Sequence, residues 1–545
     1  MAHASTESSA NTPIAIVGIG CRFPGGVSTP AGLVDFLRAH GDGIREVPSD
    51  RYARHLHHDP EDAPGKVYVT RGGYLTQDLF SFDPAPFGIS PREASYMDPQ
   101  QRLLLEVAWE SFEDAGIPVD TLRGSRTGVY VGGFTLDMQA LSLHPDNRHL
   151  VSQHTSTGVT MTVLSSRLAY TFDLRGPCLT VDTACSSSLV ATHLACQAIR
   201  EGACDRALVG GVNAIVSLGY TLVMCKGHFL SPDGRCKAFD AAANGYGRGE
   251  GAGVVLLEPL DRALAEGHRV YAVIHGSTIN HDGRTDGMAM PNEEAQAAAS
   301  REVCVRAGVD PAQVAYVEAH GTGTRAGDPV EARALGEVYG RDRAHPLYVG
   351  SIKTNVGHLE AAAGVAGLIK AALCVHRGEI LPQRPLVQPN PDIPFDTLGI
   401  EVVQAALPWP TADGPRLAAI NSFGYGGTNA HVLLGSCELP RPEPATAVPR
   451  SGPLSFALSA ASADSLASAA ANHVAWKSIS VPSLSNRMPR MPDIVITPWP
   501  EGCAYAARGP LSRRRGRLHC PCPGRREEDR WRAPCRVPRP TGRRR

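Results

Sequence analysis

Val181-Asp-Thr-Ala-Cys-Ser-Ser-Ser-Leu-Val190 is the stretch around which the rest of the chain is organised. Residues 178–181 are apolar or β-branched, which predicts a buried β-strand. Apolar residues then recur at helical spacing: Leu189, Val190, Leu194, Ala195, Ala198 and Ile199. Asp182 and Thr183 favour helix N-caps, so we expect the strand to turn directly into a helix at Cys185.

Cys185 has two alternative interpretations. At a helix N-terminus, unpaired N–H groups and the positive end of the helix dipole favour thiolate over thiol. The same N–H groups could stabilise an oxyanion that develops on a thioester carbonyl, as an acyl-transfer cysteine requires. A single cysteine is, however, more often a buried core residue. The remaining motifs must decide between the two.

The composition describes a globular protein without an obvious charged partner. The chain has 545 residues, 43% of them hydrophobic and 20% charged, with a net charge of -1, so we expect no binding to nucleic acid. Apolar runs stay below about 18 residues, so no membrane span is predicted. The polar start lacks the apolar segment of a secretory signal. The 14 scattered cysteines suit a reducing cytoplasm.

Strands and helices alternate over most of the chain, which predicts an α/β fold with a mixed sheet. Residues 13–20 form a strand with two glycines, but the third glycine of a dinucleotide-binding loop is missing. Ser90-Pro-Arg-Glu93 predicts a helix start with a capping box. Residues 98–116 predict an amphipathic helix that ends at glycine.

Cys185, His320 and His358 each follow a strand or strand-like segment and lie next to glycine or small residues. Their wide spacing lacks the short ligand pairs of a structural zinc site. A Cys-His hydrolase remains possible. Either histidine alone is more often a structural residue than a catalyst, so the surrounding motifs carry the argument.

Several stretches match the motifs of one enzyme family in the family's order: Ile19-Gly-Cys-Arg-Phe-Pro-Gly25, Met97-Asp-Pro-Gln-Gln-Arg-Leu-Leu-Leu-Glu106, Asp182-Thr-Ala-Cys-Ser-Ser-Ser188, Glu318-Ala-His-Gly-Thr-Gly-Thr324, Asn355-Val-Gly-His358 and Asn421-Ser-Phe-Gly-Tyr-Gly-Gly-Thr-Asn429. The chain resembles the β-ketoacyl synthase (ketosynthase) domain of a type I polyketide synthase. The resemblance implies a thiolase-like α/β fold, with two similar halves in five α-β-α-β-α layers, and a homodimer.

The resemblance also implies a decarboxylative Claisen condensation in polyketide or fatty acid biosynthesis. Cys185 would carry the acyl chain, and His320 and His358 would stabilise the enolate left by a malonyl- or methylmalonyl-type extender. The substrates would arrive on the phosphopantetheine arm of an acyl carrier protein, with no bound metal or redox cofactor.

The same resemblance implies roles for further residues of the site. The backbone N–H groups of Cys185 and Tyr425 would form the oxyanion hole. Lys353 and Glu331 would form a buried supporting pair. Thr322 and Thr324 would contact the pantetheine arm, and Phe423 and Asn429 would shape the pocket and its gate.

Two alternatives within the fold are less favoured. Decarboxylating loading domains carry glutamine in place of the cysteine, whereas Cys185 is present here. Thiolases also use cysteine, but they lack this pattern of two histidines with a lysine five residues before the second.

The resemblance divides the chain into five segments. We expect a disordered N-terminus over residues 1–12, a ketosynthase domain over 13–436 with halves meeting near residue 265, and a linker over 437–453. Residues 454–476 resemble the start of the unit that joins a ketosynthase to an acyltransferase. The Arg/Pro-rich residues 477–545 are predicted to be disordered, and they resemble a frameshifted reading frame. The acyltransferase would then act in trans or be encoded in a missing downstream region. The alternative function is a catalytically silent remnant or a dimeric scaffold.

Overall fold

The computed structural model describes residues 12–52, 57–410 and 414–437. The predictions for the N-terminus, the linker, the unit that starts at residue 454 and the Arg/Pro-rich tail concern segments outside the described residues, apart from residues 12 and 437. The membrane prediction can be compared with the described helices, and none of them is long and apolar enough to cross a bilayer.

The first half of the fold runs from β1 to α10. Its elements are β1 (Ile14–Arg22), α1 (Pro30–Arg38), β2 (Arg45–Glu46), β3 (Arg71–Gly72), α3 (Pro91–Ala94), α4 (Pro99–Ala115), β4 (Thr127–Gly132), α5 (Asp137–Leu143), α6 (Thr155–Val159), α7 (Val163–Phe172), β5 (Cys178–Val181), the 3-10 turn η4 (Ala184–Ser186), α8 (Ser187–Arg200), β6 (Arg206–Asn213), α9 (Gly219–Lys226), β7 (Gly251–Pro259) and α10 (Leu260–Glu266).

The second half repeats the alternation of strands and helices. Its elements are β8 (Ala272–His281), α11 (Glu293–Ala307), β9 (Val314–Glu318), α12 (Gly327–Tyr339), β10 (Leu347–Gly350), α13 (Lys353–Val356), the 3-10 turn η6 (Glu360–Ala362), α14 (Ala363–Arg377), β11 (Glu379–Ile380), α15 (Phe395–Leu398), β12 (Ile400–Val402), β13 (Leu407–Pro408), β14 (Leu417–Phe423) and β15 (Thr428–Gly435).

The main sheet has eleven strands in the order β12-β10-β9-β14-β15-β8-β1-β7-β6-β4-β5. The first half supplies β5 to β1 and the second half supplies β8 to β12. The two half-sheets join through a short antiparallel pairing of residues 14–16 with residues 272–274. Each half therefore contributes its own mixed sheet, and one continuous ladder connects them.

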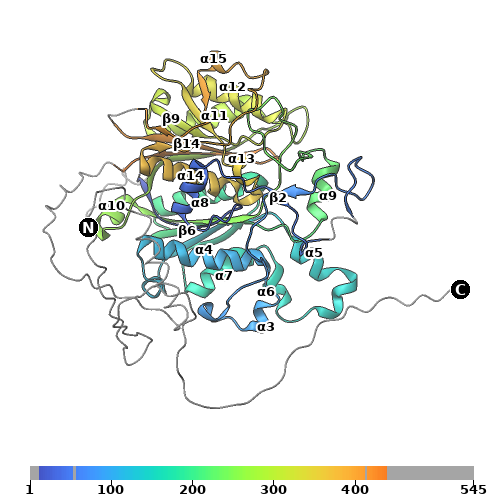
Figure 1. Ribbon diagram of the computed structural model, residues 1–545. Helices are drawn as coiled ribbons and strands as arrows, with labels where there is room; N and C mark the ends of the chain where they lie inside the picture. Colours follow the sequence, from blue (N-terminus) through green and yellow to red (C-terminus); the bar gives the residue numbers. More distant parts are fainter. Residues whose placement is uncertain (1–11, 53–56, 411–413, 438–545) are drawn as a thin grey trace, which may run out of the picture. The chain divides into compact units, whose positions relative to one another are not determined.

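Figure 1 shows the layers built on these half-sheets. Helices α8 and α14 lie in the middle and contact strands of both halves. Helices α4 and α7 cover the outer face of the first half-sheet, and α11 and α12 cover the second. The predicted five-layer, thiolase-like arrangement is confirmed.

The central helices pack closely because their facing residues are small. Residues 363–375 of α14 are all buried. A Cβ atom on Gly364 would lie 2.9 Å from the backbone nitrogen of Leu189 on α8. This distance is too short for an ordinary contact, so glycine lets the two helices touch. The small residues of α14 therefore account for the close packing of the central layer.

The helix signals near residue 90 are confirmed in part. The Ser90 hydroxyl accepts a hydrogen bond from the Glu93 backbone nitrogen at 3.1 Å. The Glu93 carboxylate, however, accepts a hydrogen bond from Arg167 at 2.6 Å, so this side chain anchors α7. Helix α4 begins after Asp98 and ends at Gly116, which has a φ of +70°, as the sequence predicted.

The prediction of a buried strand before Cys185 is wrong. Strand β5 is an edge strand that pairs only with β4 in the described part of the chain. Its residues are partly buried or exposed, and the Leu179 side chain is 47% exposed. The sequence pattern shows that a strand is apolar, but it does not show whether a neighbour within the same chain covers it.

Candidate active site

Cys185 lies in the turn η4, two residues before α8 begins. The preceding residue, Ala184, has a φ of +55°, a left-handed conformation that is uncommon for a residue with a side chain. The Asp182 carboxylate accepts a hydrogen bond from the Ala184 nitrogen at 2.9 Å, as expected of a capping residue. The Thr183 hydroxyl instead bonds to the Ser186 hydroxyl, so the predicted cap by Thr183 is wrong.

The prediction that the Cys185 thiolate is favoured is also wrong. Burial, and to a lesser extent the charge of Glu360, raise the pKa of the Cys185 thiol to about 11. The backbone N–H groups of Tyr425 and Cys185 and the charge of Lys353 lower this pKa, but by less. The Cys185 side chain is half-buried, and its desolvation outweighs the local dipoles, so the structure favours the thiol over the thiolate at neutral pH.

This pKa predicts a steep pH dependence of Cys185 alkylation. Between about pH 7 and pH 9 the thiolate fraction of a group that titrates near 11 rises about tenfold for each pH unit. We expect the rate of iodoacetamide labelling at Cys185, followed by peptide mass spectrometry, to rise by about this factor. A rate that levels off above pH 7 would show that the thiolate already dominates there.

The backbone opposite Cys185 approaches its loop closely. A Cβ atom on Gly424 would lie 2.3 Å from the Thr183 carbonyl oxygen, so only glycine fits at this position. The next residue is Tyr425, whose N–H group interacts with the Cys185 sulfur. The Ser422 hydroxyl donates a hydrogen bond to the Cys185 carbonyl oxygen at 2.8 Å. Strand β14 and the loop after it therefore hold the cysteine and two N–H groups together.

His320 follows β9 and is held by backbone groups. The Phe423 backbone nitrogen donates a hydrogen bond to His320 Nδ1 at 3.2 Å. Since Nδ1 accepts, a neutral ring carries its proton on Nε2. Burial and the nearby charge of Lys353 hold the pKa of His320 well below its ordinary value, so the ring is neutral. His320 is therefore an Nε2–H donor.

His358 has the same arrangement. The Glu360 backbone nitrogen donates a hydrogen bond to His358 Nδ1 at 3.0 Å, which places the ring proton on Nε2. This Nε2 is buried and has no partner among the described residues. Burial, with the charges of Lys353 and Arg248, holds the pKa of His358 well below its ordinary value. His358 follows the one-turn helix α13 and not a strand end, which corrects the predicted position.

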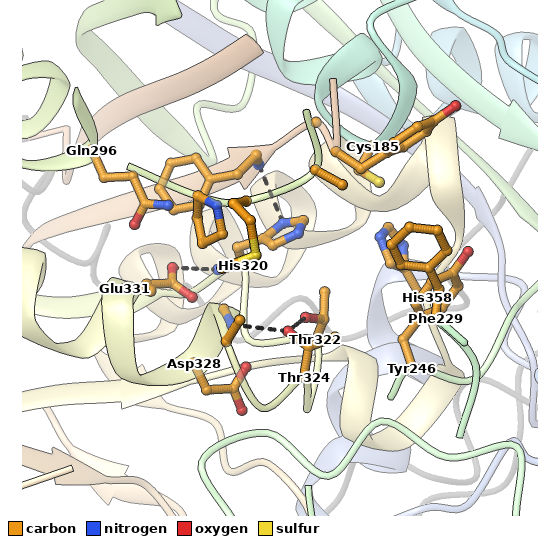
Figure 2. A pocket seen from close by; sticks show the side chains of 18 of the residues that line it. Cys185, Phe229, Tyr246, Gln296, His320, Thr322, Thr324, Asp328, Glu331 and His358 are labelled. Carbon is orange, nitrogen blue, oxygen red and sulfur yellow. Dashed lines mark hydrogen bonds between the residues drawn. The ribbon is translucent and has the colours of Figure 1, made fainter. Parts of the chain in front are cut away.

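Cys185, His320 and His358 line one cavity of about 260 Å³, shown in Figure 2. The two imidazole rings lie 5.6 Å apart between centroids and nearly perpendicular to each other. The cavity is also lined by four residues with predicted site roles and by three acidic residues: Thr322, Thr324, Phe423, Tyr425, Asp282, Asp328 and Glu331.

The two threonines lie where they can contact a substrate, and one of them also bonds to the start of a helix. Their hydroxyls lie 3.1 Å apart and both residues line the cavity. The Thr324 hydroxyl also accepts a hydrogen bond from Gly327 at the start of α12. Asn429, in contrast, is fully buried and is not a lining residue. Its amide donates a hydrogen bond to Asp282 at 2.6 Å, so it supports a lining residue from behind.

The predicted Lys353–Glu331 pair is looser than expected. Both side chains are buried, but within the described residues they do not come within the 4.0 Å of a direct ion pair. The Glu331 carboxylate accepts hydrogen bonds from the His320 nitrogen at 2.7 Å, the Gly321 nitrogen at 2.8 Å and the Asn421 amide at 2.8 Å. Glu331 therefore holds the backbone at His320, and its charge acts on Lys353 through space.

Sequence reasoning missed two buried ion pairs beside the site. Lys370 of α14 lies 2.8 Å from the Glu318 carboxylate, which also accepts a hydrogen bond from the Ile352 nitrogen at 2.7 Å. Arg248 binds Glu360 through two hydrogen bonds of 2.6 and 2.8 Å. A lysine within an otherwise apolar, Ala/Gly-rich helix was the one available signal, since such a charge requires a buried partner.

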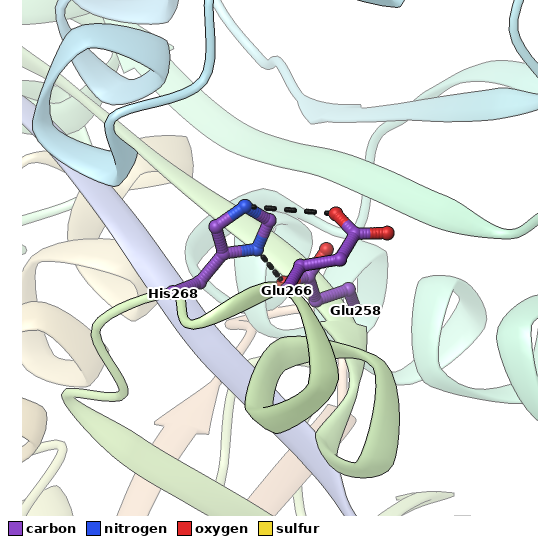
Figure 3. A group of neighbouring side chains, drawn as sticks. All are labelled: Glu258, Glu266 and His268. Atoms are coloured by element: carbon purple, nitrogen blue, oxygen red, sulfur yellow. Dashed lines mark hydrogen bonds and ion pairs between the residues drawn. The ribbon is translucent and has the colours of Figure 1, made fainter.

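A second cluster of potential metal ligands lies away from the cavity. Figure 3 shows Glu258, Glu266 and His268, with His268 Nδ1 2.6 Å from Glu258. Arg206 lies 2.7 Å from Glu258 and 3.2 Å from Glu266, and Arg262 lies 2.8 Å from Glu266. The two guanidinium groups balance both carboxylates, so we interpret the cluster as a structural ion-pair network.

Comparison with known proteins agrees with this fold. Three family models match in succession: the beta-ketoacyl synthase N-terminal domain over residues 11–263, the C-terminal domain over 271–386, and the ketoacyl-synthetase C-terminal extension over 389–487. The oxazolomycin ketosynthase domain OzmH KS7 of Streptomyces albus has a TM-score of 0.79 and 39% identity, covering 86% of this chain and 81% of that one. The module 6 ketosynthase of the Bacillus subtilis bacillaene synthase has a TM-score of 0.76 and 37% identity, covering 86% of this chain and 78% of that one.

Among curated proteins, a phenolphthiocerol/phthiocerol polyketide synthase component of Mycobacterium tuberculosis is 49% identical over 440 residues, which are 80% of this chain and 23% of that protein. Erythronolide synthase EryA2 of Saccharopolyspora erythraea is 48% identical over 452 residues, 82% of this chain and 12% of that protein. This chain thus spans less than a quarter of either relative. It belongs to the β-ketoacyl synthase family, as a ketosynthase domain of the polyketide synthase type.

Proposed function

We propose that this chain condenses an acyl chain on Cys185 with a decarboxylated malonyl- or methylmalonyl-type extender held on an acyl carrier protein. One observation carries the proposal. The two histidines are fixed by backbone N–H groups as neutral Nε2–H donors, and they line the same cavity as the cysteine. Such donors suit the stabilisation of an enolate oxygen, because they need no proton exchange during the reaction.

The first half-reaction is thioester exchange. Cys185 loses its proton and attacks the carbonyl carbon of the acyl thioester. The oxyanion accepts hydrogen bonds from the backbone N–H groups of Cys185 and Tyr425. Its collapse breaks the bond to the carrier thiol, which leaves with a proton. Because the pKa of the resting thiol is about 11, the N–H groups and the charge of Lys353 act mainly on the transition state.

The second half-reaction forms the carbon–carbon bond. The bond between the extender α-carbon and its carboxylate breaks, carbon dioxide leaves, and the electron pair remains as an enolate. The Nε2–H groups of His320 and His358 donate hydrogen bonds to the enolate oxygen. The enolate carbon then attacks the acyl carbonyl and the Cys185 thiolate leaves. The product is a β-ketoacyl thioester longer by two backbone carbons, and the electrons balance without a metal or redox cofactor.

The other lining residues are proposed to bind and orient the substrates. Thr322 and Thr324 present hydroxyls to the cavity and suit the amide groups of a pantetheine arm. The Phe423 ring lies 5.5 Å from the His320 ring and narrows the cavity beside it. We assign Asn429 a supporting role through Asp282. The alternative of a catalytically silent remnant is not favoured, because the cysteine and both histidines meet in one cavity.

Product analysis tests the proposed function. The chain would be incubated with an acyl thioester and ¹³C-labelled malonyl-carrier protein, and the carrier protein analysed by mass spectrometry. We expect a β-ketoacyl group that contains two labelled carbons, and none when the acyl thioester is withheld. Release of labelled carbon dioxide without an extended product would indicate a decarboxylase and would contradict the condensing function.

We further propose that the protein is a homodimer joined through β5. Among the described residues, this edge strand pairs on one side only. Apolar side chains near it are exposed, including Leu179 and Tyr170, which is 86% exposed on the adjacent helix α7. An exposed apolar edge strand favours pairing with another chain. The free thiols of the described cysteines suit the cytoplasm, where we place the enzyme with a carrier protein and an acyltransferase as partners.

The proposed dimer predicts that Leu179→Arg separates the two chains. A charge on this edge strand would be desolvated in the interface, so we expect the mass in size-exclusion chromatography with light scattering to fall from that of two chains to one. Val305→Arg is the matched control, because Val305 is 80% exposed on α11 in the opposite outer layer. A wild-type monomer, or an equal effect of both variants, would contradict the proposed dimer.

A further inference from the structure

A line of buried hydrogen bonds leads from Glu331 away from the cavity. Asn421 of β14 donates to Glu331 at 2.8 Å, and its carbonyl oxygen lies 2.5 Å from Nδ1 of His431 on β15. His431 Nε2 lies 2.8 Å from the Tyr339 hydroxyl of α12. The Cys304 thiol of α11 contacts the same hydroxyl at 3.7 Å. All five side chains are at most 3% exposed.

The direction of each hydrogen bond follows from the carboxylate. An ionised Glu331 only accepts, so the Asn421 amide nitrogen donates to it and the Asn421 oxygen is free to accept. His431 must then carry its proton on Nδ1, which leaves Nε2 as the acceptor for the Tyr339 hydroxyl. In this order the Tyr339 hydroxyl donates to His431 Nε2 at 2.8 Å, while the Ser300 carbonyl oxygen is a more distant acceptor at 3.5 Å. The donors of Tyr339, His431 and Asn421 then all point toward Glu331. Burial lowers the pKa of His431 to about 3, which agrees with the neutral ring that this order requires.

We propose that Asn421, His431 and Tyr339 are positioning residues for His320, acting through Glu331. The Glu331 carboxylate accepts from both the His320 and the Gly321 backbone nitrogens, as Figure 2 shows for His320. Asn421 keeps this carboxylate in place, and His431 and Tyr339 fix the orientation of the Asn421 amide. The inference rests on the proposed function, because the consequence concerns the step that uses His320.

A functional role for this network is favoured because apolar residues could stabilise the fold about as well. A buried polar network stabilises a fold little better than well-packed apolar residues, but it specifies one geometry. The network joins β14, β15 and α12 to the turn that carries His320. Burial raises the pKa of Glu331, and the hydrogen bonds that Glu331 accepts and the charge of Lys353 on α13 oppose this rise. The charge of Glu331 in turn raises the pKa of Asp328 on α12. A shift of the carboxylate would move the His320 backbone and misdirect its Nε2–H group.

The test compares two substitutions of His431 in the full chain. His431→Leu removes the donor to Asn421, whereas His431→Asn places an amide nitrogen close to the former position of Nδ1 and can still donate. His193→Leu is the matched control, because His193 is also buried and neutral but bonds to Ser277 outside the network. Acylation of Cys185 and decarboxylation of malonyl-carrier protein are measured separately for each variant.

We expect His431→Leu to lower decarboxylation by about tenfold or more while Cys185 acylation stays within about twofold of wild type. His431→Asn should restore most of the decarboxylation, and His193→Leu should leave the ratio of the two rates unchanged. Equal losses in both half-reactions, or no rescue by asparagine, would overturn the inference. Failure of the wild-type chain to decarboxylate would instead contradict the proposed function.

A spectroscopic measurement tests the network independently of activity. In ¹⁵N-histidine-labelled wild-type protein, the His431 signals are identified by their loss in His431→Asn. The network predicts a neutral ring with its proton on Nδ1 between about pH 5 and pH 8, unlike the Nε2–H form of His320. A His431 ring that titrates in this range, or that carries its proton on Nε2, would overturn the inference even if the enzyme proves inactive.

Discussion

Cys185→Ala is expected to lower acylation of the chain by more than about 10⁴-fold, while decarboxylation of malonyl-carrier protein remains measurable. The nucleophile is lost, but the Nε2–H groups of His320 and His358 are fixed by backbone bonds from Phe423 and Glu360, which the substitution leaves in place. Intact-protein mass spectrometry measures the acylation, and release of labelled carbon dioxide measures the decarboxylation.

Cys196→Ala is the control for this prediction. Cys196 lies on α8, the helix that follows Cys185, and is fully buried away from the cavity. Its substitution should change neither half-reaction. If Cys185→Ala still accepted an acyl group, or if both alanine variants lost acylation equally, Cys185 would not be the acyl carrier.

His358→Leu is expected to have the second-largest effect, with decarboxylation falling by about 10²- to 10³-fold and Cys185 acylation staying within about twofold. The Nε2 of His358 is a buried donor with no partner among the described residues, and a leucine side chain cannot replace it. Charge development on the enolate oxygen would then depend on His320 alone. Stopped-flow measurement of carbon dioxide release gives the rate of this step.

The chemical form of the His358 group is tested by a matched variant. Glutamine places an amide nitrogen near the position of Nε2 and donates a hydrogen bond without titrating. His358→Gln should therefore retain more activity than His358→Leu, with a flat pH profile near neutrality. Two results together would contradict this role and indicate that His358 acts by proton transfer. The glutamine variant would be as inactive as the leucine variant, and the wild-type rate would change with pH around the ordinary pKa of histidine.

Local sequence signals predicted much of this structure. The motif order identified the family, and the capping residue Ser90 and the helix end at Gly116 matched the structure. The nucleophile and the two histidines were found because each lies beside glycine or small residues at the end of a regular segment, and the fold brings these ends together at one cavity.

The predictions that proved wrong share a physical cause. The spacing of residues along the sequence does not show which side chains are buried or which distant segments they contact. The Cys185 thiolate was predicted from local dipoles, but desolvation by distant segments dominates its pKa. The family resemblance assigned Asn429 to the pocket, whereas its side chain turns to Asp282. The partner of Glu331 proved to be the backbone at His320, a contact that no side-chain motif reveals.

The most direct test of the account is the intact mass of the chain after incubation with an acyl thioester and then with malonyl-carrier protein. We predict a mass increase of one acyl group, mapped to Cys185 by peptide analysis, that disappears on addition of the extender as a β-ketoacyl product forms. A folded protein that never acquires the acyl group, or that carries it on another residue, would contradict the assignment of this site as the centre of a condensing enzyme.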